Sequence, residues 1–199
     1  MCGIGRVNLK RPLQLYLASG EFVCMIVKDK SIGLTLWLQW ILVNSIAWGM
    51  VMIAFLATSD RSNYNIIGGV MTGAIVGFAF GAVQWISLRW WIHHSGWWIL
   101  ASIIGGAFSL PVGGVFSQVI GLTIFGFIVG AAQWVLLRRW VYQSGLWVLA
   151  SGVGGFSGGL IGVWSGNSFQ VAGYMIGGVV FGAITGSILV WLLKRPVVT

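Results

Sequence analysis

Charged residues are scarce in this chain, and acidic residues are the scarcest. Only 7% of the 199 residues are charged, and the acids are Glu21, Asp29 and Asp60. A soluble domain typically carries about 25% charged residues. No acid lies inside a long apolar run, which excludes paired-carboxylate catalysis. It also excludes the intramembrane carboxylates that proton relays and cation-coupled carriers commonly use.

Cysteine and histidine are almost as rare. Cys2 and Cys24 both lie in an N-terminal segment that we place in the cytoplasm, where thiols stay reduced, so neither a disulfide nor a bound metal is expected. No Ser-His-Asp set, metal-ligand cluster or phosphate-binding loop occurs, and the chain is therefore predicted not to be an enzyme. His93 and His94 could ligate a haem or pigment, but we favour solvated turn residues, and no cofactor is expected.

Apolar residues dominate instead. The hydrophobic share is 58% and the mean hydropathy is +0.94. Six long apolar runs lie at about 31–59, 66–91, 97–117, 119–140, 146–166 and 171–193. Each approaches or exceeds the roughly 20 residues needed to span a bilayer as a helix, and in lipid only a helix pairs all its backbone groups internally. The sequence predicts an all-α transmembrane fold of six helices.

The predicted domains are a cytoplasmic or interfacial segment, 1–30, a six-helix transmembrane domain, 31–196, and a short tail, 197–199. The apolar stretch of the first segment is interrupted by Gly20 and Glu21, which favours an interfacial amphipathic helix over a signal peptide. Translation that begins at Met25 is an alternative. Pro111 is the only proline inside an apolar run, and it predicts a kink there.

Basic residues give the expected orientation. Ten of the eleven Lys and Arg residues flank the same side of the predicted helices, and Arg61 is the exception. The positive-inside rule places that side in the cytoplasm, so both termini are predicted to be cytoplasmic. The net charge of +8 then indicates topology and affinity for anionic lipid headgroups rather than nucleic acid.

Tryptophans gather near the same side. They are Trp37, Trp40, Trp85, Trp90, Trp91, Trp97, Trp98, Trp134, Trp140, Trp147 and Trp191. Because indole prefers the headgroup level of a bilayer, this grouping predicts an aromatic belt. A dedicated lipid or pigment surface is the alternative.

An internal repeat is the strongest feature of the chain. Residues 77–106 and 126–155 share 17 of 30 aligned positions at an offset of 49 residues. Weaker echoes extend to both ends, although the last copy has Thr185 where the others have Gln84 and Gln133. We interpret the chain as three hairpins of like orientation, about 31–91, 97–140 and 146–193, which predicts a pseudo-threefold six-helix bundle with parallel repeats.

Glycines spaced four residues apart predict how the helices pack. They are Gly69, Gly73, Gly77, Gly81, Gly126, Gly130, Gly154, Gly158, Gly162, Gly178, Gly182 and Gly186. Such glycines share a helix face and let two backbones approach closely, as in a glycine zipper. An inner ring of small residues lining a pore is the alternative.

The repeated QWxxLR motif has two interpretations. In the first, Trp85 with Arg89 and Trp134 with Arg138 anchor the chain at lipid headgroups, because residues four apart share a helix face. The motif's glutamine then hydrogen-bonds to a neighbouring helix. In the second, the motif's glutamines contribute to polar rings around the pseudo-threefold axis. The candidate rings are Gln84, Gln133 and Thr185, and Asn44, Ser102 and Ser151.

At these repeats the chain resembles uncharacterised small multi-pass membrane proteins of the cyanobacterial type, in which hairpins with the pattern GxxxGxxQWxxLR recur. The resemblance implies the multi-pass fold and a plasma (inner) or thylakoid membrane location, but no mechanism. We expect a non-catalytic accessory protein whose partners are the bilayer, anionic headgroups and other membrane subunits. The alternative is a passive transporter, channel or binder for a small, weakly charged solute.

Overall fold

The computed structural model describes residues 30–58, 66–89, 96–115, 117–138, 141, 143–166 and 169–193. Within these ranges six helices follow one another along the chain. They are α3 (Lys30–Thr58), α4 (Ile66–Leu88), α5 (Trp97–Val115), α6 (Gln118–Leu137), α7 (Leu146–Trp164) and α8 (Gln170–Leu193). The prediction of an all-α fold with six helices is confirmed.

Five of the helices are long and apolar enough to cross a membrane. They are α4, α6, α7 and α8 over their full lengths and α3 over Gly33–Ile53. The apolar stretch of α5, Trp97–Val112, is shorter, and this helix continues through Pro111. The fold is that of a multi-pass α-helical membrane protein.

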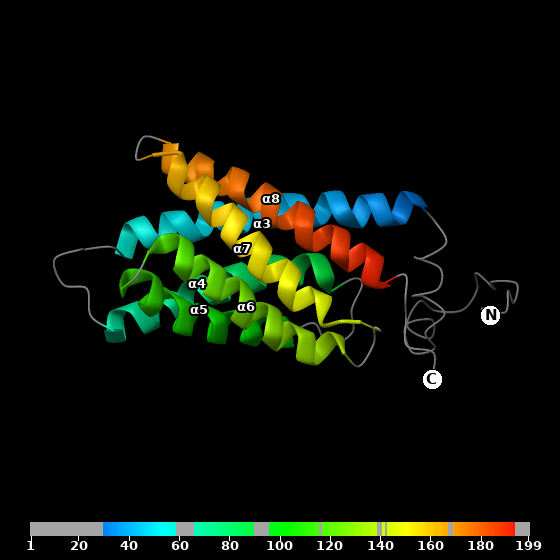
Figure 1. The fold of residues 1–199 in the computed structure, drawn as a ribbon, viewed down its shortest axis with the longest axis horizontal. Coiled ribbons are helices and arrows are strands. Elements are labelled where there is room, and N and C mark those ends of the chain that lie inside the picture. The colour runs from blue at the N-terminus through cyan, green and yellow to red at the C-terminus, as the bar shows by residue number, and fades with distance from the viewer. Residues whose placement is uncertain are drawn as a thin grey trace, which may run out of the picture.

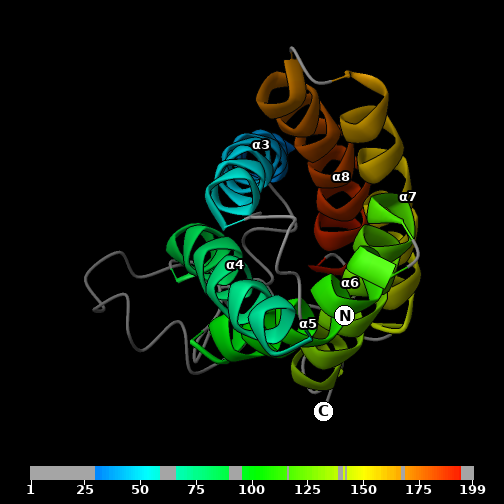
Figure 2. The same ribbon diagram turned by 90° about the vertical axis from the view of Figure 1, so that its left-hand side faces the viewer.

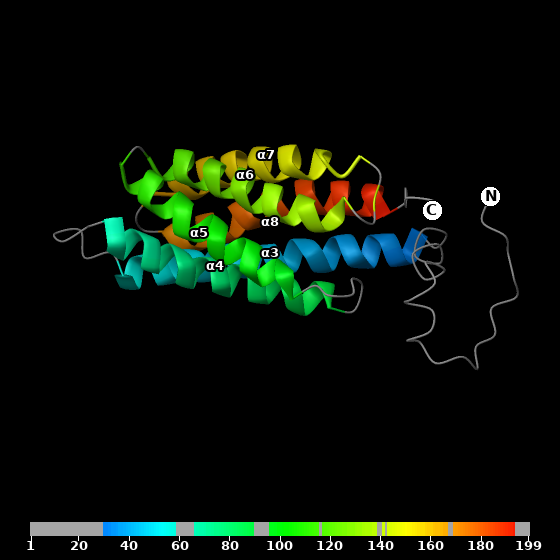
Figure 3. The ribbon, with the colours of Figure 1, turned by 90° about the horizontal axis from the view of Figure 1, so that it is seen from below.

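The six helices close into a ring. Each packs against the next in the chain, and α8 packs against α3 (Figure 2). Consecutive helices are antiparallel, so α3 begins and α8 ends at the same end of the bundle, which we call the Lys30 end (Figure 1). Helices α4 and α6 also end there, and α3 extends farther in that direction than its neighbours (Figure 3).

Glycine allows the closest approaches between helix backbones. A Cβ atom on Gly77 of α4 would overlap the carbonyl group of Ser102 in α5, and one on Gly126 of α6 would overlap that of Ser151 in α7. In α8, a Cβ on Gly182 would lie 2.8 Å from the Cα of Ile41 in α3. All twelve glycines of the spaced series are buried. These contacts join α4 to α5, α6 to α7 and α8 to α3.

The interior of the ring is filled by two apolar clusters. The first, toward the Lys30 end, contains Trp40, Leu88, Trp98, Leu137, Val141, Trp147, Leu189 and Leu192. The second contains Ala47, Trp48, Met52, Phe80, Phe125, Val129, Tyr174 and Phe181. Along α4 the order is Leu88, Gln84, Phe80, so a polar residue lies between the two clusters. Asn44, Gln133 and Thr185 have the same intermediate position on α3, α6 and α8.

Candidate functional site

The candidate site is the buried polar layer between the two apolar clusters. Three indole N–H groups donate into it. Trp98 of α5 bonds Gln84 Oε1 of α4 at 2.8 Å, and Trp147 of α7 bonds Gln133 Oε1 of α6 at 2.9 Å. Trp40 of α3 bonds Thr185 Oγ1 of α8 at 2.9 Å. The same tryptophan hydrogen bond therefore recurs three times, once at each of the three glycine-mediated helix pairs.

Side-chain amides connect these three pairs. Gln133 Nε2 donates to Gln84 Oε1 at 3.4 Å, and Gln84 Nε2 donates to Asn44 Oδ1 at 2.7 Å. Asn44 Nδ2 in turn donates to the backbone carbonyl of Trp40 at 2.8 Å. Since Trp40 bonds Thr185, one continuous hydrogen-bond network includes side chains from all six helices.

The network is buried inside the bundle. Gln84 and Gln133 are each 2% exposed, and Thr185 is fully buried. The rings of Trp40, Trp98 and Trp147 contact one another edge-on, with centroid separations of 5.7 to 6.3 Å. Such T-shaped aromatic pairs stabilise a packed core beyond their buried area. The polar side chains thus bond between helices instead of lining an open passage.

The three residues of the second predicted ring, Asn44, Ser102 and Ser151, differ in their hydrogen bonding. Asn44 belongs to the network, whereas Ser102 Oγ donates to the Trp98 carbonyl of its own helix at 3.0 Å. Ser151 Oγ is buried and has no hydrogen-bond partner among the described residues. The three side chains are all buried, but only Asn44 contributes to the shared network.

The expected aromatic belt is wrong for three of its tryptophans. Trp40, Trp98 and Trp147 are at most 1% exposed, because their N–H groups find acceptors inside the bundle. Sequence spacing held a usable signal. Each of these tryptophans precedes Asn44, Ser102 or Ser151 by four residues, so it shares their buried helix face. Trp37, Trp85, Trp97, Trp134 and Trp191 remain half-buried or exposed, as an interfacial position requires.

The two arginines of the repeated motif lie at the Lys30 end. Arg89 follows α4 and Arg138 caps α6, and both are exposed. Each guanidinium stacks over the tryptophan one turn earlier, at 5.7 Å from the ring centroid of Trp85 and 5.5 Å from that of Trp134. These two Trp–Arg pairs are the predicted headgroup anchors, and they do not belong to the buried polar layer.

Several candidate residues lie outside the described ranges. They are His93, His94, Cys2, Cys24, Trp90, Trp91 and Trp140. Among the described residues no group of three or more His, Cys, Asp or Glu side chains could hold a metal ion.

At the α8–α3 pair, the residue in the glutamine position is shorter and the residue in the serine position is longer than at the other two pairs. The α4–α5 and α6–α7 pairs combine a glutamine with a serine, whereas the α8–α3 pair combines the shorter Thr185 with the longer Asn44. A Cβ on Gly182, three residues before Thr185 in α8, would lie 3.2 Å from Asn44 Cβ, so these two helices meet closely here. Asn44 therefore occupies space that a glutamine at 185 would need.

We predict that the substitutions Thr185→Gln and Asn44→Ser compensate each other. Thr185→Gln alone overpacks the layer, and Asn44→Ser alone leaves Gln84 Nε2 without its acceptor, so each should destabilise by about 1–3 kcal/mol. The double variant should recover about 1–3 kcal/mol relative to the sum. Reversible SDS unfolding in mixed micelles measures this coupling. Strictly additive losses would mean that the two side chains do not share one space.

Together, the helix ring and its buried polar layer define a class, that of a multi-pass helical membrane protein with buried polar side chains bonded between its helices. Comparisons with protein families, with curated proteins and with solved structures find no match to this chain.

Proposed function

We propose that this chain is a non-catalytic accessory protein of a membrane complex. It acts through contacts on its outer surface, while its interior serves only its own cohesion. The proposal is based on the hydrogen-bond network that joins all six helices. In this network the polar groups of Gln84, Gln133 and Thr185 bond other helices of the bundle, so they stabilise the fold. The proposed partners are the bilayer, its anionic headgroups and other membrane subunits. The proposed location is the plasma (inner) or thylakoid membrane, and the proposed relatives are the cyanobacterial-type multi-pass proteins.

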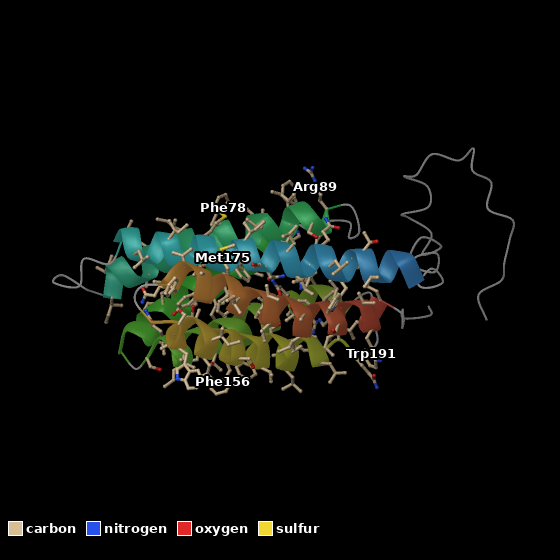
Figure 4. The ribbon with its side chains drawn as sticks, turned by 90° about the horizontal axis from the view of Figure 1, so that it is seen from above. Phe78, Arg89, Phe156, Met175 and Trp191 are labelled. Carbon is tan, nitrogen blue, oxygen red and sulfur yellow. The ribbon has the colours of Figure 1, made fainter. Side chains whose placement is uncertain are left out.

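The outer surface supports the same role. Phe78 of α4 is 54% exposed and Phe156 of α7 is 47% exposed, and they point outward on opposite sides of the bundle (Figure 4). Large apolar side chains exposed around a helical bundle suit contact with lipid or with other transmembrane helices. The outer surface therefore offers the area on which another membrane subunit would bind.

Photo-crosslinking in native membranes tests the accessory role. A photoreactive residue at Phe78 and another at Phe156 sample opposite sides of the ring. We expect one of the two positions to yield a discrete protein adduct, because a binding surface occupies one side. The adduct should be lost when neighbouring exposed Ile75 or Val153 on the same side is changed to tryptophan. Lipid adducts alone from both positions, with the chain recovered as a monomer, would contradict the proposal.

The alternative is passive transport along the axis, and the closed layer argues against it. A conducting path needs polar side chains that face water, whereas these bond to one another and to three mutually packed indoles. The proposed pseudo-threefold symmetry is compatible with either function, since it concerns the arrangement of repeats and not the access of solute.

We predict that proteoliposomes containing the chain release trapped small polar solutes no faster than protein-free liposomes. The polar side chains are buried and bond to one another, so we expect no water-filled route for such solutes. Release is followed by fluorescence dequenching, with Gln84→Leu and Gln133→Leu proteins as comparisons. A wild-type flux above background that both substitutions abolish would restore the transport alternative.

A further inference from the structure

The Lys30 end carries the same surface feature twice. Trp85 lies one helical turn after Gly81, which packs on α5, and Trp134 lies one turn after Gly130, which packs on α7. Each half-buried indole therefore flanks a seam between two closely packed helices. The guanidinium of Arg89 or Arg138 lies over that indole, and the arginine backbone N–H donates to the tryptophan carbonyl at 2.8 Å.

At the third seam, between α8 and α3, this feature is replaced. Gly186 stands where the others have tryptophan, and a Cβ there would lie 3.1 Å from Cδ1 of Trp37 in α3. Trp37 Nε1 donates to Ala183 O at 3.2 Å and to Ser187 Oγ at 3.0 Å, so α3 supplies the indole instead.

Among the described residues, no arginine accompanies the indole at this third seam. Val190 takes the arginine position, and its Cγ1 would lie 3.4 Å from a Cβ on Gly33 of α3. Helix α3 extends past its neighbours at the Lys30 end (Figure 3). Within the part of the chain that the structure describes, the Trp–Arg pair therefore occurs at the α4–α5 and α6–α7 seams and not at the α8–α3 seam.

The chemistry of the two exposed arginines fits a phosphate group. A guanidinium presents several N–H donors in a planar fork that matches phosphate oxygens. Because stacking on the indole already restricts the arginine side chain, binding a phosphate costs it less conformational entropy. Figure 4 shows Arg89 projecting from the end of α4. Next to the tryptophans, Ile86 and Val135 are 51% and 40% exposed, so an apolar surface adjoins each cation.

We propose that each Trp–Arg pair binds the headgroup of one anionic phospholipid, giving two such sites per chain and none at the α8–α3 seam. The guanidinium contacts the phosphate, and the acyl chains lie along Ile86 or Val135. A free phosphate ion would use only the guanidinium, whereas a phospholipid uses the cation and the apolar surface together. The excess positive charge of the chain favours an anionic lipid over a zwitterionic one. This inference does not depend on the accessory role.

Native mass spectrometry of the full chain in detergent, titrated with phosphatidylglycerol, tests the proposal. We expect two tightly bound lipids, with phosphatidylcholine binding more weakly. Arg89→Gln and Arg138→Gln should each weaken one site about fivefold, which corresponds to about 1 kcal/mol at 25 °C. Lys30→Gln removes the same charge at the same end of the bundle and should leave both sites intact. Arg89→Lys should retain part of the binding because it keeps the charge.

Three results would overturn the proposal. The first is equal affinity for phosphatidylcholine. The second is two undiminished sites in the Arg89→Gln/Arg138→Gln double variant with an unchanged helical circular dichroism spectrum. The third is displacement of phosphatidylglycerol by millimolar inorganic phosphate, which would assign the sites to a free anion.

Discussion

Replacing Gly77 by alanine is expected to destabilise the bundle by about 3 kcal/mol, although alanine is the better helix former by about 1 kcal/mol. The added Cβ would overlap the backbone carbonyl of Ser102, and a backbone group cannot move aside as the tip of a flexible side chain does. Helices α4 and α5 must therefore separate, and they lose contact along their whole seam. Gly126→Ala should have the same effect on α6 and α7, because it meets Ser151 in the same way.

Gly145→Ala provides the matched control. A Cβ at Gly145 would meet no atom within 4 Å, and the residue has a right-handed helical backbone with φ −60°. Its substitution should change the free energy of unfolding by less than about 0.5 kcal/mol. SDS unfolding curves of the three variants supply the comparison. If Gly77→Ala and Gly145→Ala were equally stable, the proposed close approach of α4 and α5 would be wrong.

Gln84→Leu is expected to cost about 2–4 kcal/mol, the largest loss of any single change in the polar layer. Gln84 accepts from Trp98 and Gln133 and donates to Asn44, so leucine leaves three buried polar groups without a partner. Each orphaned group costs about 1–3 kcal/mol, and the lipid setting lowers the sum because the unfolded chain in a membrane also finds partners. Gln133→Leu should cost less, because Gln133 makes one short and one long bond.

A double variant separates lost hydrogen bonding from lost packing. Trp98→Phe removes the indole donor, so in the Gln84→Leu/Trp98→Phe protein one of the unsatisfied groups no longer exists. We expect the double variant to lose about 1 kcal/mol less than the sum of the single variants. Ser157→Ala, which removes a bond within α7 only, should be nearly neutral. Equal losses in Gln84→Leu and Ser157→Ala would contradict a network that spans the ring.

The fold class was predictable from the sequence because a lipid solvent allows few backbone structures. Runs of about 20 apolar residues become helices in a bilayer, and the limits of the six predicted runs match the structure within a few residues. The four-residue spacing of Gly77 and Gly81 likewise pointed to buried helix faces. The partner of each face was not predictable, because any helix in the bundle could meet a glycine surface.

The candidate site was only partly predictable for a related reason. Gln84, Gln133 and Thr185 stood out as polar residues at matching places in a repeated apolar sequence. Their bonding partners did not stand out, because a tryptophan near a run of basic residues is equally consistent with a headgroup position. Burial of Trp40, Trp98 and Trp147 depends on where the helices cross, which no local pattern records.

The sequence by itself determined that this chain forms apolar helices with small-residue faces and a few internal amides. Its apolar composition implies a lipid environment, and the spacing of its residues decides which of them share a helix face. Tertiary structure alone decided that α8 packs against α3, that three indoles pack against one another inside the bundle, and that Asn44 lies within hydrogen-bond distance of Gln84. Those outcomes depend on contacts between residues far apart in the chain, such as Trp40 and Thr185, which are 145 positions apart, and only ring closure brings them within hydrogen-bond distance.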